Sequence, residues 1–407
     1  MTDLSRRGAW MVAICATLTM TVSYIDRATL GVLAPSVTKA LDISETEYGW
    51  LTSAFSIAYL VSTPLAGWWI DRVGARRGLV GSVLVWSAVA AMHALVPGFG
   101  VLFALRIALG IAEGPSFPGS AQTVQRVLPP NERARGFGVL FTGSSIGGMM
   151  VPPLAAFLYS LGGWRIAFLG TALIGLLWVP LWLWATRRAV VRARLDAPPG
   201  VINAPRPPFM VLARHPLMVR AFVAMMAVAP AVGFLQAWGA KYLVRTHELL
   251  QEDVGAYLWL PPLGLDVGAI LFGDLASRQH REGAPPRALF AIGALLCASI
   301  GLLPYCTTPW QAMIVLSTSM AGGGAIYTLV TADFLGRMPA SSVSFAGGIL
   351  AGAQSLMLII VNPLIGKVVD AQGHYDSVAY ALGAWVIPGC VIWLLWPPAP
   401  YVPGRQA

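Results

Sequence analysis

Charged residues are scarce in this sequence. Asp, Glu, Lys and Arg make up 11% of the 407 residues, whereas soluble globular domains carry roughly 25%. Hydrophobic residues account for 57% of the chain. This composition excludes an ordinary soluble domain. It favours an integral membrane protein, in which stretches of about 20 apolar residues cross the hydrocarbon core as helices.

Cysteine and histidine are also few. The four cysteines form no Cys-x-x-Cys pair, and the five histidines have no spacing typical of metal ligands. The sequence contains no nucleophile–base arrangement and no phosphate-binding loop. We therefore expect no metal site, no cofactor and no enzymatic activity.

Apolar segments recur along the chain, and twelve of them can be counted. A Pro- and Arg-rich stretch, "RRAVVRARLDAPPGVINAPRPPFMVLARHP", separates the sixth from the seventh. The pattern predicts an all-α integral membrane protein with two pseudo-symmetric six-helix bundles, 1–186 and 217–407, joined by a cytoplasmic linker, 187–216. A motif supports this symmetry, because "GWWIDRVGARRGL" (67–79) is echoed by "FGDLASRQHREGAPPRAL" (272–289). Internal repeats of this kind are typical of secondary transporters.

The basic residues indicate how the chain is oriented. Of the 27 Lys and Arg residues, 20 lie in the N-terminal segment, the even-to-odd loops and the C-terminal segment. The opposite loops carry acidic residues such as Asp42, Glu45 and Glu47. The positive-inside rule then places both termini in the cytoplasm and the protein in the cell (inner) membrane. The net charge of +9 therefore reflects orientation, and we expect no nucleic-acid partner.

Several motifs resemble a known family. The pattern Gly-x-x-x-Asp-Arg-x-Gly-x-Arg-Arg at 67–77 resembles the loop signature of the major facilitator superfamily. Within it, the sequence is similar to the anion:cation symporter family, most of all to its hexuronate-transporter branch. The stretches that carry this resemblance are "YIDRATLGVLAP" (24–35), "RIALGIAEGPSFPGS" (106–120), "PPNERARGFG" (129–138) and 236–275.

Two charged residues, Asp26 and Arg27, interrupt the first apolar segment. A charge at mid-membrane costs at least ~2.5–3.5 kcal/mol, so such residues usually have a task. They point about 100° apart on a helix and therefore meet different neighbours. The resemblance implies that Arg27 grips a substrate carboxylate and that Asp26 takes part in proton coupling. A buried structural ion pair is the alternative.

Arg106 and Glu113 lie seven residues apart in the fourth segment. This spacing is close to two helical turns, so both side chains can flank one polar cavity. Pro115 and Pro118 follow and free backbone carbonyls there. The resemblance implies that Glu113 is a protonation site, and from the spacing we expect Arg106 to act with it in proton coupling. Alternatively, Arg106 snorkels to a membrane surface.

The remaining candidates are weaker. Tyr59 matches a substrate-binding tyrosine of the family or is a core aromatic residue. Neutral groups that suit sugar hydroxyls, or that merely bridge helices, are Ser144, Gln236, Gln354 and Asn362. A gating latch, or simple fixing of orientation, is expected from Asp71, Arg72, Arg76 and Asp274. The roles of Asp266, Asp333 and Lys241 are open.

These features predict a proton-coupled symporter for an organic anion such as a hexuronate or aldonate, working by alternating access. We expect a monomer whose partners are the anion, the proton and the lipid bilayer. The tenth segment, "GGGAIYTLVTADF", lacks a Trp and a Pro typical of the branch, so the choice among acids stays open. The alternatives are a drug/proton antiporter and a symporter of a non-sugar monocarboxylate. A sensor or a membrane enzyme has no supporting motif.

Overall fold

The computed structural model describes residues 4–196, 214–278, 286–337 and 343–396. All regular structure in these ranges is helical. The chain divides into two compact units: unit 1 comprises Met1–Val201, Gly239–Val244 and Glu248–Trp259, and unit 2 comprises Ile202–Trp238, Arg245–His247 and Leu260–Ala407. The predicted linker overlaps the helix α7 (Ala189–Leu195), and residues 197–213 of it lie outside the described ranges. The boundaries 1–186 and 217–407 stay a prediction.

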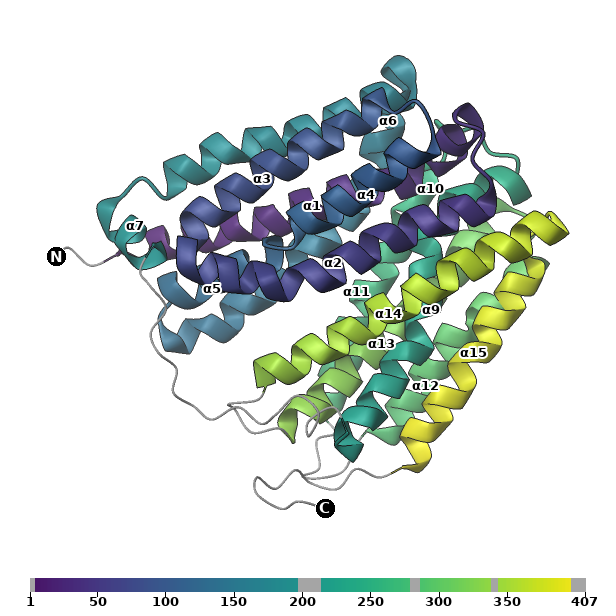
Figure 1. Ribbon diagram of the computed structural model, residues 1–407. Helices are drawn as coiled ribbons and strands as arrows, with labels where there is room; N and C mark the ends of the chain where they lie inside the picture. Colours follow the sequence, from purple (N-terminus) through teal and green to yellow (C-terminus); the bar gives the residue numbers. More distant parts are fainter. Residues whose placement is uncertain (1–3, 197–213, 279–285, 338–342, 397–407) are drawn as a thin grey trace. The chain divides into compact units, whose positions relative to one another are not determined.

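The helices of unit 1 run alongside one another, with α7 at the end of the bundle that carries the N-terminus (Figure 1). They are α1 (Arg6–Ala40), α2 (Glu45–Val73), α3 (Ala75–Met92), η1 (His93–Leu95), α4 (Phe99–Glu113), α5 (Ser116–Val127), α6 (Pro130–Ala185), α7 and α10 (Gly255–Leu258). The α6 ribbon holds two rods, because Gly162 and Gly163 have non-helical backbone angles.

Unit 2 consists of long apolar helices as well. They are α9 (Pro216–Thr246), whose residues 239–244 belong to unit 1, α11 (Leu260–Arg278), α12 (Arg287–Ala298), η2 (Ser299–Tyr305), α13 (Pro309–Gly336), α14 (Val343–Gln372) and α15 (Asp376–Leu395). Glycines allow close packing here, because a Cβ on Gly264 or Gly268 of α11 would lie 2.4 or 2.0 Å from a backbone oxygen of α13.

Counted as rods in the described ranges, the helices confirm the predicted fold class. Ten helical segments are long and apolar enough to cross a membrane. One of them, α6, contains two rods. The helix α2 adds the twelfth rod: it is 29 residues long but less apolar, because Ser, Thr and Tyr residues interrupt it. Unit 1 is built around α1, which packs along α6 where Gly143 and Gly147 leave room for its backbone.

Candidate functional site

Four ionisable side chains of unit 1 lie inside membrane-length helices. Asp26 and Arg27 come from α1, and Arg106 and Glu113 come from α4. Asp26 is 2% exposed, Arg106 4% and Glu113 0%. The helix α4 ends directly after Glu113, where Gly114 and a proline follow. Arg106 is enclosed by protein, on one helical face with Glu113.

Glu113 binds Arg27 through one of its two oxygens. Its Oε2 accepts hydrogen bonds from Arg27 Nε at 3.2 Å, Arg27 Nη2 at 3.0 Å and Ser23 Oγ at 2.8 Å. Its Oε1 is buried and has no hydrogen-bond partner. A guanidinium binds a carboxylate best with two parallel bonds, one to each oxygen. Arg27 therefore does not make the two parallel hydrogen bonds, one to each carboxylate oxygen, that its guanidinium group could form.

Three aromatic rings surround the guanidinium of Arg27. Its Cζ lies 4.4 Å from the ring centroid of Tyr59, 4.8 Å from that of Tyr24 and 4.9 Å from that of Phe55. These distances permit cation–π attraction. The Arg27 side chain is still 21% exposed. The aromatic rings thus fix the position of the Arg27 guanidinium group, while its exposed part stays accessible to a ligand.

Arg106 is less well satisfied. Its Nε and Nη1 atoms are buried and have no hydrogen-bond partner. Its Cζ lies 4.7 Å from the ring centroid of Phe55, so this one ring contacts both guanidinium groups of the site. Buried N–H donors of this kind are costly unless something accepts from them.

The carboxyl group of Asp26 forms no hydrogen bond with the neighbouring Arg27. Both of its oxygens are buried and have no hydrogen-bond partner. The indole of Trp86 lies beside it, and the Trp86 Nε1 atom also has no formed hydrogen bond. Asp26 is therefore a carboxyl group enclosed by protein without any group that would stabilise its ionised form through a formed bond.

The four neutral candidates lie on three helices, α6, α9 and α14. In unit 1, Ser144 is half-buried and donates to the Phe141 carbonyl of its own helix at 2.7 Å. In unit 2, Asn362 is buried and its Oδ1 accepts from Trp238 Nε1 at 3.1 Å. Gln354 is half-buried, and Gln236 is exposed. Their roles in binding stay predictions.

Each of the predicted latch residues contacts a residue of its own unit. Asp71 accepts from the Gln122 amide at 2.7 Å, and Arg72 lies over the Trp68 ring at 3.6 Å. Arg76 donates from Nε to Thr186 Oγ1 at 3.2 Å. In α11, Asp274 pairs with Arg278 one turn later at 2.8 Å. Arg76 thereby connects α3 to the end of α6.

The three residues with open roles are placed as follows. In unit 1, Lys241 pairs with Glu45 at 2.9 Å and donates to Thr38 Oγ1 at 2.7 Å. In unit 2, Asp333 binds the fully buried Arg220 at 2.8 Å, and it also binds Arg337 at 2.8 Å. Asp266 is half-buried on α11.

Sequence reasoning missed Ser23, Phe55 and Trp86. A spacing signal existed for two of them, because Ser23 lies four residues before Arg27 and Phe55 four residues before Tyr59. Residues at this spacing share a helix face. No such signal leads to Trp86, since its position beside Asp26 depends on how α3 packs against α1.

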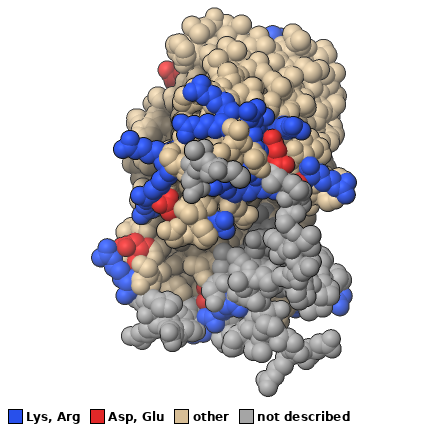
Figure 2. All heavy atoms as spheres, turned by 90° about the vertical axis from the view of Figure 1, so that its left-hand side faces the viewer, with Lys and Arg blue, Asp and Glu red and all other residues tan. Residues whose placement is uncertain are grey.

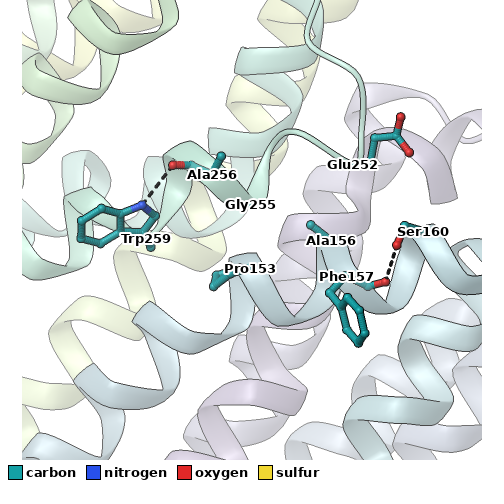
Figure 3. A pocket seen from close by; sticks show the side chains of 8 residues that line it. All are labelled: Pro153, Ala156, Phe157, Ser160, Glu252, Gly255, Ala256 and Trp259. Carbon is teal, nitrogen blue, oxygen red and sulfur yellow. Dashed lines mark hydrogen bonds between the residues drawn. The ribbon is translucent and has the colours of Figure 1, made fainter.

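A separate pocket of unit 1, about 350 Å³ in volume, is drawn in Figure 3. It lies between α6 and the segment around α10, and it shares no residue with the charged cluster. Ser160 and Trp259 donate within their own helical turns, to the carbonyls of Phe157 and Ala256. Two of its hydrogen-bonding groups are thus used locally, and its one charged residue, Glu252, is exposed, so the charged cluster is the better candidate.

The twelve rods and the charges enclosed by one of the two units are typical of membrane transporters. Comparison with known proteins identifies the family of transporters. The family profile of the Major Facilitator Superfamily matches residues 16–361. The chain belongs to this superfamily, and it is a multi-pass membrane transporter.

Curated relatives confirm the resemblance to sugar-acid carriers. The chain is 25% identical to the hexuronate transporter of Escherichia coli (strain K12), covering 94% of this chain and 93% of that protein. It is 24% identical to the D-galactonate transporter of Escherichia coli O6:H1, with 96% and 95% covered. The hexuronate transporter of Bacillus subtilis is 27% identical, with 90% and 88% covered.

A solved structure has the same fold. A bacterial homologue of the human lysosomal transporter Spinster, in an inward-facing and unoccupied conformation, superposes with a TM-score of 0.73 at 19% sequence identity. The match covers 96% of this chain and 95% of that chain.

Proposed function

We propose that the protein is a proton-coupled symporter that takes up a sugar acid, such as a hexuronate or an aldonate, by alternating access. The observation that carries the proposal is the contact between Arg27 and Glu113, because it gives the cation of the site a partner whose charge a proton can remove. The relatives named above, transporters of hexuronate and D-galactonate, support the substrate class.

The first step is an exchange of partners at Arg27. While Glu113 is ionised, it occupies Nε and Nη2 of Arg27. A proton on Glu113 removes its negative charge and frees both donors. The substrate carboxylate then accepts two parallel hydrogen bonds from the guanidinium, an arrangement that Glu113 does not make. Anion binding and proton binding therefore favour each other.

Asp26 supplies a second proton site. An ionised carboxylate that is buried without a partner costs several kcal/mol, so we expect Asp26 to carry a proton in the arrangement seen here. When the transporter changes state and water reaches Asp26, that proton is released. Movement of protons down their gradient thereby drives accumulation of the anion.

Arg106 gives the site a second set of donors. Its unpartnered Nε and Nη1 atoms suit the hydroxyl groups next to the carboxylate of a sugar acid. We propose that Tyr59 and Ser144 of unit 1 add contacts to the substrate; the substrate-binding roles of Gln236, Gln354 and Asn362 stay predictions from the sequence. A smaller acid without hydroxyl groups would leave Arg106 unsatisfied and would bind more weakly.

The test is uptake of labelled glucuronate into proteoliposomes that contain the purified full chain. We expect accumulation with an inward proton gradient, loss of accumulation with a protonophore, and no drive from a sodium gradient. Unlabelled galactonate should compete, and benzoate should not. No uptake and no competition by any acid, together with binding of lipophilic cations, would overturn the proposal in favour of a drug antiporter.

One variant separates coupling from binding. Glu113→Gln mimics the protonated carboxyl group permanently, so we expect it to exchange internal for external substrate but not to accumulate substrate. Glu252→Gln is the matched control, because it makes the same chemical change on an exposed residue. Gradient-driven accumulation by Glu113→Gln would show that this carboxyl group is not the coupling site.

The orientation and the latch complete the proposal. We propose that the monomer lies in the inner membrane with both termini in the cytoplasm, because the segments that hold 20 of the 27 basic residues then lie on the cytoplasmic side. The latch residues Asp71, Arg72, Arg76 and Asp274 then lie at the cytoplasmic ends of their helices. Fluorescence of a C-terminal GFP fusion, and inactivity of the corresponding alkaline phosphatase fusion, would support this orientation. The reverse result would overturn it.

A further inference from the structure

Two buried polar groups of unit 1 lie next to each other without forming a hydrogen bond. The carboxyl group of Asp26, on α1, has both oxygens buried and without a partner. The indole of Trp86, on α3, lies beside this carboxyl group, and its Nε1 donor is also buried and without a partner. A buried indole N–H group usually has an acceptor. A donor without an acceptor thus stands beside an acceptor without a donor.

The packing of three helices sets this arrangement. Val22 lies one turn before Asp26 on the same face of α1, and Ser87 follows Trp86 on α3. A Cβ at Gly175 of α6 would lie 2.2 Å from Ser87 Oγ and 3.3 Å from Val22 Cγ1. The absence of a side chain at Gly175 therefore lets α1, α3 and α6 approach closely at the level of Trp86 and Asp26.

Neither group is open to bulk water. Exposed charges are hydrated, and Figure 2 shows Lys and Arg gathered at the surface of one face of the molecule. Asp26 is 2% exposed and Trp86 is 0% exposed. An ionised Asp26 at this depth depends on protein groups for its hydrogen bonds, and the indole N–H group of Trp86 is the donor beside it.

The charged groups nearest in the chain and in space do not replace this donor. Glu113 of α4 acts on Asp26 through its charge, and like charges repel. Arg27 follows Asp26 in the chain, but its Nε and Nη2 atoms donate to Glu113. Glu113 therefore makes ionised Asp26 less stable, and Arg27 gives it no hydrogen bond.

The other elements that pack against α1 add few ionisable groups in the described part of unit 1. The two rods of α6 contain none over residues 136–158 and 166–186. The remaining ones on α3, α4 and α5 are arginines, namely Arg76 and Arg77 in the first turn of α3, Arg106 over the ring of Phe55, and Arg126 in the last turn of α5. The proton on Asp26 is therefore governed mainly by Glu113 and by the indole of Trp86.

We propose that Trp86 is a positioning residue for the proton of Asp26, because its indole N–H group donates to the Asp26 carboxylate once that carboxyl group ionises. The inference rests on the proposed role of Asp26 in proton coupling. The proton passes from the carboxyl group to a water molecule that reaches the site, and the indole keeps its own proton. A charge-assisted hydrogen bond then stabilises ionised Asp26, so that proton release does not leave a buried charge without a partner.

The experiment follows the infrared C=O band of the protonated Asp26 carboxyl group in the purified full chain as the pH is raised. Asp26→Asn identifies the band by its loss. Trp86→Phe removes the donor to ionised Asp26, so the band should persist to a pH about 1–2 units higher than in the wild type. Trp178→Phe is the matched control, because this buried indole donates to the Cys15 carbonyl at 2.9 Å instead. It should leave the pH at which the band disappears unchanged.

Transport gives a second readout. In proteoliposomes at neutral internal pH, Trp86→Phe should accumulate less glucuronate than the wild type but should still exchange internal for external substrate. Raising the internal pH by about 1–2 units should restore accumulation, because Asp26 then releases its proton again. A merely structural role of Trp86 would lower exchange and accumulation together at every pH, and this result would overturn the proposal.

A third measurement needs no change at Trp86 and decides the matter if that variant does not fold. The indole N–H signals of isotope-labelled protein are followed by NMR over the same pH range. One signal should move at the pH at which the Asp26 band disappears, and it should stay in place in Asp26→Asn. No such signal, or an unchanged band in folded Trp86→Phe, would overturn the role of Trp86. An infrared spectrum that Asp26→Asn leaves unchanged would instead overturn the proton role of Asp26 itself.

Discussion

The contact between Arg27 and Glu113 makes a prediction that a double-mutant cycle can test on protein stability alone. In Arg27→Met, Glu113 keeps the hydrogen bond from Ser23 but loses the two from Arg27. Hydrogen bonds to charged groups contribute about 1.5–3 kcal/mol each. Two of them amount to about 3–6 kcal/mol, in line with the 3–5 kcal/mol that follows the loss of one partner of a buried ion pair. We expect the single variant to be destabilised by about 3–5 kcal/mol.

The double variant Arg27→Met/Glu113→Gln should regain most of that loss. The neutral Gln amide can still accept the Ser23 hydrogen bond, and the unpaired carboxylate at position 113 is gone. Loss of the aromatic contacts of Arg27 is common to the single and the double variant, so it cancels in the cycle. The coupling free energy is therefore expected to be about 2–4 kcal/mol in favour of the native pair.

The measurement is the free energy of unfolding for all four proteins, followed by tryptophan fluorescence during SDS titration in mixed micelles. The chain offers 15 tryptophans as probes. Arg165→Met is the control, because this arginine is exposed and should cost little. A double variant that is no more stable than Arg27→Met would refute the reasoning, since it would mean that the buried charge of Glu113 is not what destabilises the single variant.

Three further predictions concern packing, each measured by thermal unfolding. Gly147→Ala should destabilise by about 1–3 kcal/mol, because its Cβ would lie 2.6 Å from a backbone oxygen of α1. Gly138→Ala, in the same helix with open space around it, should not destabilise. Gly74→Ala should cost about 1–3 kcal/mol, because Gly74 has φ of +86° and its Cβ would lie 2.9 Å from the backbone just after α7. Trp238→Phe should cost about 1–3 kcal/mol by leaving Asn362 Oδ1 buried without its donor, and an unchanged melting temperature would contradict this.

The fold was accessible from the sequence because a bilayer sets a length scale. Apolar runs long enough to cross it identify helices without any knowledge of how the helices pack. Two breaks interrupt the rods, and the sequence already separates two apolar segments at the second of them. Gly114 and the following proline divide the fourth rod, and Gly162 with Gly163 divides α6. Both consist of residues that end helices, but such residues also occur inside other helices here, such as Pro35 in α1.

The site could be predicted only in part, for a physical reason. Asp26, Arg27, Arg106 and Glu113 are conspicuous because ionisable residues are rare in apolar segments. Which of them meet depends on how α1 and α4 are rotated about their axes, and the sequence of each helix does not determine this. The contact of Arg27 with Glu113, the isolation of Asp26 and the shared ring of Phe55 therefore emerge only from the structure.

The two units handle their buried charges differently, within the part of the chain that the structure describes. In unit 2, the two oxygens of Asp333 bind Arg220 and Arg337, one each, although Arg220 Nη2 is buried without a hydrogen-bond partner. In unit 1, Glu113 uses one oxygen for Arg27, while Asp26 and Arg106 keep buried polar atoms without partners. Asp333 therefore has no oxygen left over, whereas the unpartnered atoms of Asp26, Glu113 and Arg106 would be stabilised by a proton or an anion. The features that make unit 1 costly to fold are thus the ones on which the proposed coupling of proton and anion depends.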